Sequence, residues 1–102
     1  MANISCSLDQ AGLTERRARW HRLAAQAFDA RVPTDRGQRL VFRRQAGVEE
    51  ELLELALLEQ ECCAFADWSV SAVDGTVVLD VSGTSDEAIA AVQGMFGSLQ
   101  RA

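Results

Sequence analysis

The dipeptide Asp74-Gly75 constrains the fold more than any other feature of this sequence. A two-residue hairpin turn needs a positive φ, which Asp-Gly supplies at little cost. On both sides of the turn, apolar residues alternate with small or polar ones, a pattern typical of strands with one buried face. Pairing Val73 with Thr76 places the apolar residues of both segments on that face. They are Trp68, Val70, Ala72, Val77, Leu79 and Val81.

Three other segments have the periodicity of amphipathic helices. We expect the first helix at residues 14–30, ended by Pro33, and the second at residues 48–63, where leucine and glutamate are abundant. A capping box at residues 84–87 opens the third. The apolar stripe of the first helix is Trp20, Leu23, Ala24, Ala27 and Phe28, and that of the third is Ile89, Val92, Phe96 and Leu99.

A short strand is expected at residues 39–43. The element order helix, strand, helix, strand, strand, helix favours an α+β fold, in which helices pack on one face of an antiparallel sheet of about three strands. The length of 102 residues and the 48% hydrophobic content indicate one domain, residues 1–102, with a loosely ordered start at 1–12. So small a sheet leaves an edge or a face uncovered, which favours a homodimer.

The sequence also bears on location. No apolar run approaches the roughly 18 residues that a membrane-spanning helix needs, and residues 1–8 lack the basic start and apolar stretch of a signal peptide. We therefore expect a cytoplasmic protein that does not contact a membrane. In that compartment, an odd number of cysteines, here three, favours free thiols or metal ligands over a disulfide framework.

Charge is distributed unevenly along the chain. Residues 15–44 contain nine arginines and three acids, whereas residues 45–100 contain eleven acids and no base. We expect the basic first helix and the acidic second helix to complement each other, within one chain or across a dimer. The alternative is an arginine-rich face for phosphates. The net charge of −5 argues against direct binding of nucleic acid.

The candidate site lies near the end of the second helix, at Glu59, Cys62 and Cys63. On a helical wheel of residues 48–63, Glu59 falls on the apolar side, between the two cysteines. A carboxylate in an apolar stripe is unfavourable unless it is protonated, paired with a cation or bound to a metal. Three glutamates mark the opposite, solvent side of this helix, namely Glu50, Glu54 and Glu61.

Positions i, i+3 and i+4 of a helix are neighbours, so Glu59, Cys62 and Cys63 can converge on one point. Two thiolates and a carboxylate form a partial shell for a thiophilic ion such as zinc, copper(I) or mercury(II). His21 is the candidate for a further ligand, and Cys6 is a weaker one. The alternative for His21 is a partly exposed position on the flank of the first helix.

Each of these residues also has a purely structural interpretation. Cys62 and Cys63 can pack as small buried side chains, and Glu59 can form an internal ion pair with Arg17. A disulfide between adjacent cysteines is disfavoured, because their α-carbons are about 3.8 Å apart. A catalytic cysteine is also disfavoured, because the helix dipole raises the pKa of a thiol near the C-terminal end of a helix. We identify no catalytic residue and no organic cofactor.

The run Glu59-x-x-Cys62-Cys63-x-Phe65 follows a leucine-rich helix and precedes the alternating hairpin. In this it resembles a set of small, largely uncharacterised bacterial proteins, and also segments appended to regulators of the mercury-resistance type. The resemblance covers residues 13–96. It implies a role near thiophilic metals or thiol stress, with Cys62 and Cys63 as the matching residues. Because the chain has no separate helix-turn-helix region, any regulatory role would require a protein partner.

The sequence thus leads to a small cytoplasmic protein that binds a thiophilic metal as sensor, buffer or carrier. Its ligands would be Glu59, Cys62, Cys63 and His21. Two alternatives remain open. One is a dimeric interaction module in which the cysteines pack and Glu59 pairs with an arginine. The other is a thiol enzyme, which needs a cysteine of lowered pKa.

Overall fold

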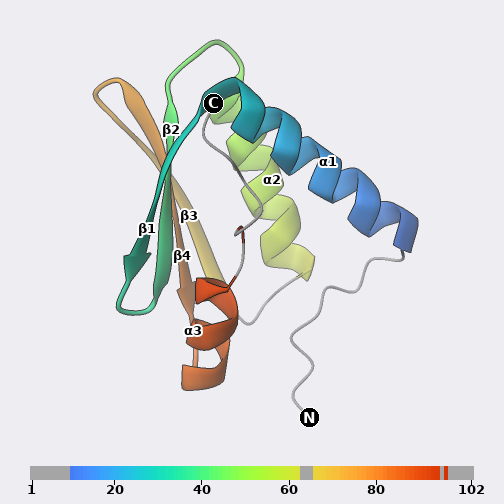
Figure 1. Ribbon diagram of the computed structural model, residues 1–102, viewed down its shortest axis with the longest axis vertical. Helices are drawn as coiled ribbons and strands as arrows, with labels where there is room; N and C mark the ends of the chain where they lie inside the picture. The colour runs from blue at the N-terminus through green and yellow to red at the C-terminus, as the bar shows by residue number, and fades with distance from the viewer. Residues whose placement is uncertain (1–9, 63–65, 95, 97–102) are drawn as a thin grey trace.

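The computed structural model describes residues 10–62, 66–94 and 96, with the backbone alone at 10–13 and 62. Among these residues, the four strands form one antiparallel sheet in the order β1-β2-β4-β3, and the helices lie on one face of it (Figure 1). The α+β class and the one-sided packing are confirmed, with four strands instead of three. The elements are α1 (Gln10–Ala27), β1 (Phe28–Thr34), β2 (Gly37–Arg43), α2 (Val48–Cys62), β3 (Ala66–Val73), β4 (Thr76–Gly83) and α3 (Asp86–Gln93).

The additional strand is β1, which lies partly where the first helix was predicted to continue. Helix α1 begins at Gln10, four residues before the predicted start, and ends at Ala27. The helical stripe misled the prediction because Phe28 is buried in either conformation, here with its ring centroid 5.4 Å from that of Phe42. Pro33 lies within β1 and does not end a helix. An edge strand tolerates proline where no N–H is needed for pairing.

The hairpin of β3 and β4 is confirmed residue by residue. Val73 pairs with Thr76, Val70 with Leu79 and Trp68 with Val81. The positive φ in the turn belongs to Asp74, at 52°. Strand β2 pairs with the other side of β4, so β4 lies inside the sheet and β3 is an edge strand.

The core lies between the sheet and the helices. From β2 it receives Leu40 and Phe42, both fully buried. The predicted orientation of α2 is also confirmed, because Leu52 and Leu55 are fully buried while the glutamates at 50, 54 and 61 are exposed. The other buried apolar residues are Trp20, Leu23, Ala24, Ala27, Phe28, Val48, Ala56, Ala66, Val77, Leu79, Val81, Ala88 and Val92.

Helix α3 packs closely on the end of β4. Its N-cap is Ser85, whose hydroxyl accepts a hydrogen bond from the Ala88 amide at 3.1 Å. A Cβ at Gly83 would lie 2.3 Å from the Ile89 nitrogen, so only glycine permits this approach. The helix ends before the predicted stripe does: Phe96 follows it with a φ of 64°, and residue 99 lies outside the described residues.

Candidate functional site

Glu59 is buried in the last turns of α2, as the helical wheel predicted. Only 8% of the residue is exposed, although its neighbours Gln60 and Glu61 are more open. Two groups from α1 reach its carboxylate. The Trp20 indole Nε1 donates a hydrogen bond to Oε2 at 2.9 Å, and Arg16 Nη1 lies 3.3 Å from the same oxygen. The buried carboxylate is therefore compensated by a cation and an N–H donor from the neighbouring helix.

The arginine that pairs with Glu59 is Arg16 and not the predicted Arg17, which is exposed. Arg16 precedes Trp20 by four residues and Leu23 by seven, so it extends the buried stripe of α1 toward the N-terminus. The spacing in the sequence already contained this signal. The side chains of Arg16 and Glu59 are 12% and 11% exposed, which makes this a largely desolvated ion pair.

Three aromatic rings form the apolar wall beside this pair. The ring centroid of Phe96 lies 5.0 Å from that of Trp20 and 5.9 Å from that of Trp68, both in edge-to-face geometry. Trp68 Nε1 is buried and has no hydrogen-bond acceptor in the described part of the chain, whereas Arg16 Nη1 contacts Glu59 as an ion pair without hydrogen-bond geometry. The Trp68 indole N–H is therefore a buried donor that the described contacts leave unused.

The Gln60 side chain links the end of α2 to the start of β3, the two elements on either side of the cysteine pair. Its Nε2 donates to the Ala66 carbonyl at 2.8 Å, and its Oε1 accepts from the Trp68 amide at 3.1 Å. Both backbone groups belong to the start of β3. One side chain thus fixes the distance between the end of α2 and the beginning of the next strand.

The structure describes the side chains of only two of the four predicted metal ligands, Glu59 and His21. Helix α2 ends at Cys62, one turn beyond Glu59, but the Cys62 side chain, Cys63 and Cys6 lie outside the described residues. His21 is exposed on α1, in agreement with its structural alternative. Among the side chains that the structure describes, no group of three His, Cys, Asp or Glu is arranged to hold a metal ion. Glu59 instead contacts Arg16 and Trp20.

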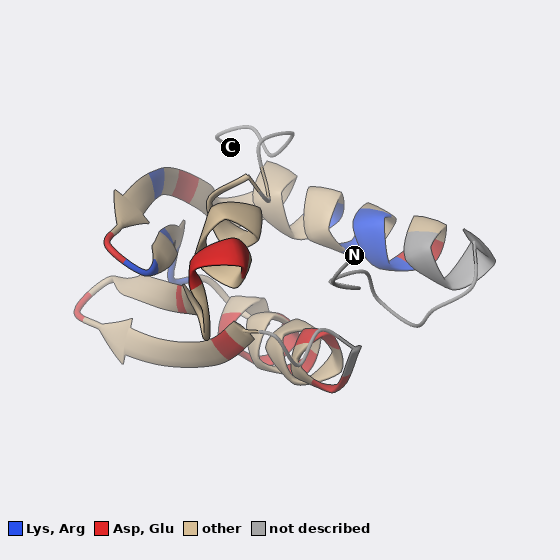
Figure 2. Cartoon of the chain, turned by 90° about the horizontal axis from the view of Figure 1, so that it is seen from below, with Lys and Arg blue, Asp and Glu red and all other residues tan. Residues whose placement is uncertain are grey.

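The charged residues of α1 and α2 meet along the rest of the helix pair, as predicted. The Arg19 guanidinium donates to Glu51 at 2.8 and 3.1 Å and also to Glu54 (basic residues blue, acidic residues red in Figure 2). The hydrogen bonds to Glu51 and Glu54 raise the pKa of Arg19. The hydrogen bond from Arg19 lowers the pKa of Glu51, and the more distant charge of Arg22 adds to this effect. Arg19 therefore binds acids of its own chain.

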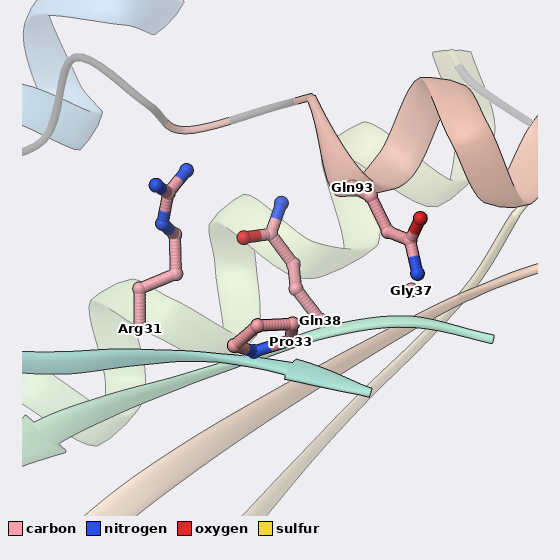
Figure 3. A pocket seen from close by; sticks show the side chains of 5 residues that line it. All are labelled: Arg31, Pro33, Gly37, Gln38 and Gln93. Atoms are coloured by element: carbon pink, nitrogen blue, oxygen red, sulfur yellow. The ribbon is translucent and has the colours of Figure 1, made fainter. Parts of the chain in front are cut away.

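A separate cavity of about 120 Å³ lies between the β1–β2 hairpin and α3. Gln38 is buried and donates to the Val92 carbonyl, while Gln93 donates to the Thr34 carbonyl at 3.0 Å. This cavity was not predicted from the sequence, although Gln38 stands in line with the inward-facing Leu40 and Phe42, and that alternation was its signal. The two glutamines tie α3 to the hairpin. The lining residues are Arg31, Pro33, Gly37, Gln38 and Gln93 (Figure 3).

Comparison with protein families, curated proteins and solved structures gave no match for this chain. Within the described residues, no helix has both the length and the apolar surface needed to cross a membrane.

Proposed function

We propose that the protein is a small cytoplasmic binder of thiophilic metals, with Cys62 and Cys63 as its donor pair. The observation that carries this proposal is the buried Arg16–Glu59 pair one helical turn before the cysteines. Because Glu59 is compensated by Arg16 and Trp20, we assign it a positioning role instead of a ligand role. Copper(I) and mercury(II) suit such a site best, since two thiolates satisfy their preference for few, soft ligands.

The electrostatics near the end of α2 support thiolate formation. Cys62 lies one helical turn after Glu59, and the Arg16 guanidinium contacts Glu59, so we expect this cation to act on the thiol pair. A nearby cation lowers the pKa of a thiol, and N–H donors without acceptors favour an anionic partner. Arg16 supplies the cation, which also pairs with Glu59, and Trp68 supplies a buried N–H without an acceptor among the described residues. They oppose the helix dipole, which favours the neutral thiol at this end.

Metal titration of the reduced protein tests the proposal. We expect the wild-type chain to bind one equivalent of copper(I) or mercury(II), and the double variant Cys62→Ser, Cys63→Ser to lose that binding. The matched control is Cys6→Ser, which removes a thiol outside the pair and should leave stoichiometry and affinity unchanged. Unaltered binding by the double serine variant would overturn the proposal.

The proposed role of Arg16 has its own readout. In Arg16→Gln the cation is lost, so we expect the alkylation of Cys62 and Cys63 by iodoacetamide to require a higher pH. Arg16→Lys should restore part of the wild-type profile, because it keeps the charge. Identical pH profiles for the wild-type protein and Arg16→Gln would remove Arg16 from the site.

A second candidate function is an interaction module in which the cysteines only pack. The Arg16–Glu59 pair favours it in one respect, because it accounts for the burial of Glu59 without a metal. This candidate predicts that Cys62→Ala with Cys63→Ala leaves folding and assembly intact and that no metal binds tightly. The same titration therefore separates the two candidates.

A further inference from the structure

Strand β3 lies at the edge of the sheet, and the pairing register shows which of its backbone groups face outward. Val73 and Thr76 close the two-residue turn, so they form a hydrogen-bonded pair. In an antiparallel ladder, hydrogen-bonded and non-hydrogen-bonded pairs alternate. The amides and carbonyls of residues 66, 68, 70 and 72 therefore point away from β4. The contacts of Gln60 with the Ala66 carbonyl and the Trp68 amide agree with this direction.

Gln60 occupies the first part of this edge and leaves the rest open. The outward groups that remain are the Trp68 carbonyl, both backbone groups of Val70 and both of Ala72. None of them has a hydrogen-bond partner among the described residues. An exposed row of this kind is a template for pairing with another strand.

The opposite edge of the sheet differs in the features that prevent such pairing. Strand β1 has a register shift between Phe28 and Ala30, and it contains Pro33, which has no amide to donate. Strand β3 has regular pairing over its eight residues, no proline, and Asp67 as its one charged residue. The two edges are therefore not equivalent, and β3 is the one suited to association.

We propose that β3 pairs with β3 of a second copy, antiparallel, about a two-fold axis at Val70. In this register, each Val70 amide donates to the carbonyl of Val70 of the partner subunit. Each Ala72 amide donates to the carbonyl of Trp68 of the partner subunit. In this register the carbonyl of Ala72 of the partner subunit faces the Trp68 amide, so it replaces Gln60 Oε1 as the acceptor there. Pairing joins the two sheets into one that is continuous across the axis.

The side chains on both faces of β3 suit this register. On the helix side, Trp68 lies opposite Ala72 of the partner subunit, a large residue against a small one, and Val70 lies opposite its own copy. On the other side, Ser69 lies opposite Ser71 of the partner subunit. Asp67 lies opposite a valine, so no like charges face each other directly. Two copies of the strand therefore match in their backbone hydrogen-bonding groups, in the sizes of the facing side chains and in charge.

Helix α2 extends the same surface above the strand. Leu53 and Leu57 are 43% and 66% exposed, and together with Gln60 they follow the spacing i, i+4, i+7 of one helix face. Because the Gln60 side chain reaches the edge of β3, this face is directed toward that edge. Pairing of the strands brings the leucines of the two copies together and explains their exposure in a single chain.

Sedimentation and hydrogen exchange over a concentration series test the proposal. We expect the wild-type chain to reach twice its mass of 11.1 kDa. The amides of Val70 and Ala72 should then become protected from exchange as the dimer forms, because they have no acceptor among the residues that the structure describes. A wild-type protein that stays monomeric up to millimolar concentration, or that dimerises while these amides exchange freely, would overturn the proposal.

Two variants locate the interface. Val70→Pro removes an amide that the β3–β4 ladder does not use, and Leu57→Glu places a charge on the exposed face of α2. Each should raise the dimer dissociation constant at least tenfold with an unchanged circular dichroism spectrum. The matched control is Val32→Glu at a 45% exposed valine of the opposite edge strand, which should not affect the dimer. If Leu57→Glu dimerises normally, or Val32→Glu alone does not, the β3 edge is not the interface.

This inference does not rest on the thiophilic site. The double variant Cys62→Ser, Cys63→Ser should remain dimeric under reducing conditions while losing metal. Loss of metal binding with an intact dimer supports both proposals, and an intact dimer in a protein that binds no metal rejects only the proposed function.

Discussion

The two ends of the α1–α2 interface use the same chemistry in different surroundings. At one end, Arg16 pairs with Glu59 and both side chains are nearly nine-tenths buried. At the other end, Arg19 pairs with Glu51 and Glu54, whose side chains are 33% and 63% exposed. Water screens the second pair and barely reaches the first. We therefore expect burial, and not the number of ion pairs, to decide how much each end contributes to stability.

The difference has a consequence for how the helices are aligned. An exposed ion pair can be lost at little cost, because water replaces the missing partner. A buried carboxylate that loses its cation remains desolvated and uncompensated. We therefore expect the Arg16–Glu59 end to fix the position of α1 relative to α2, and the Arg19 end to add only a small stabilisation.

The largest predicted effect is that of Glu59→Ala. This change leaves the Arg16 guanidinium and the Trp20 indole N–H buried without an acceptor, so we expect the free energy of unfolding to fall by about 3 kcal/mol or more. Chemical denaturation of the reduced protein measures it. The control is Glu61→Ala, an exposed position two residues later, which should change stability by about 0.5 kcal/mol or less.

A double variant sharpens this prediction. Arg16→Met with Glu59→Met replaces the ion pair with apolar side chains of similar length. It should be more stable than Glu59→Ala, because no charge is left buried alone. A Glu59→Ala protein within about 1 kcal/mol of wild type would show that the two ends of the interface do not differ as the burial implies.

A smaller effect is expected for Arg19→Ala. The side chain of Arg19 is 20% exposed and both of its partners are more exposed, so the loss should be about 1 kcal/mol or less. This difference should shrink at high salt, whereas the effect of Glu59→Ala should hardly change. Denaturation at low and high ionic strength checks both statements, and a salt-independent loss for Arg19→Ala would contradict them.

The smallest predicted effect is the contribution of Glu51 to the pH dependence of stability. Its pKa in the folded protein is lowered, mainly by the hydrogen bond from Arg19. A lowered pKa contributes stability above the ordinary value of about 4.3, and this stability is lost as the pH falls through the folded-state pKa. In Glu51→Gln the acid-side loss should be shallower than in wild type. If the stability of wild type and of Glu51→Gln falls in parallel from pH 6 to pH 3, Glu51 contributes nothing to the acid-side loss.

Much of the fold follows from local patterns in the sequence. The β3–β4 register and the inward direction of Glu59 were predicted correctly, because the periods of two and 3.6 residues assign each side chain to a face. Strand β1 was missed, because Phe28 continues the helical stripe of α1 and only its pairing with Phe42 distinguishes the strand. In the candidate site, choosing Arg17 over Arg16 was an error of interpretation, since the spacing from Trp20 and Leu23 indicated Arg16.

The sequence by itself determined which residues face inward and how the hairpin pairs, since both depend on neighbours a few positions apart. Only the tertiary structure decided what meets the inward face of Glu59, how Gln60 holds the start of β3, and that β3 and not β4 lies at the edge. These outcomes depend on contacts between residues six to 45 positions apart, for which no local period exists. The local pattern supplied the buried acid, and the packing of α1 against α2 supplied its partners.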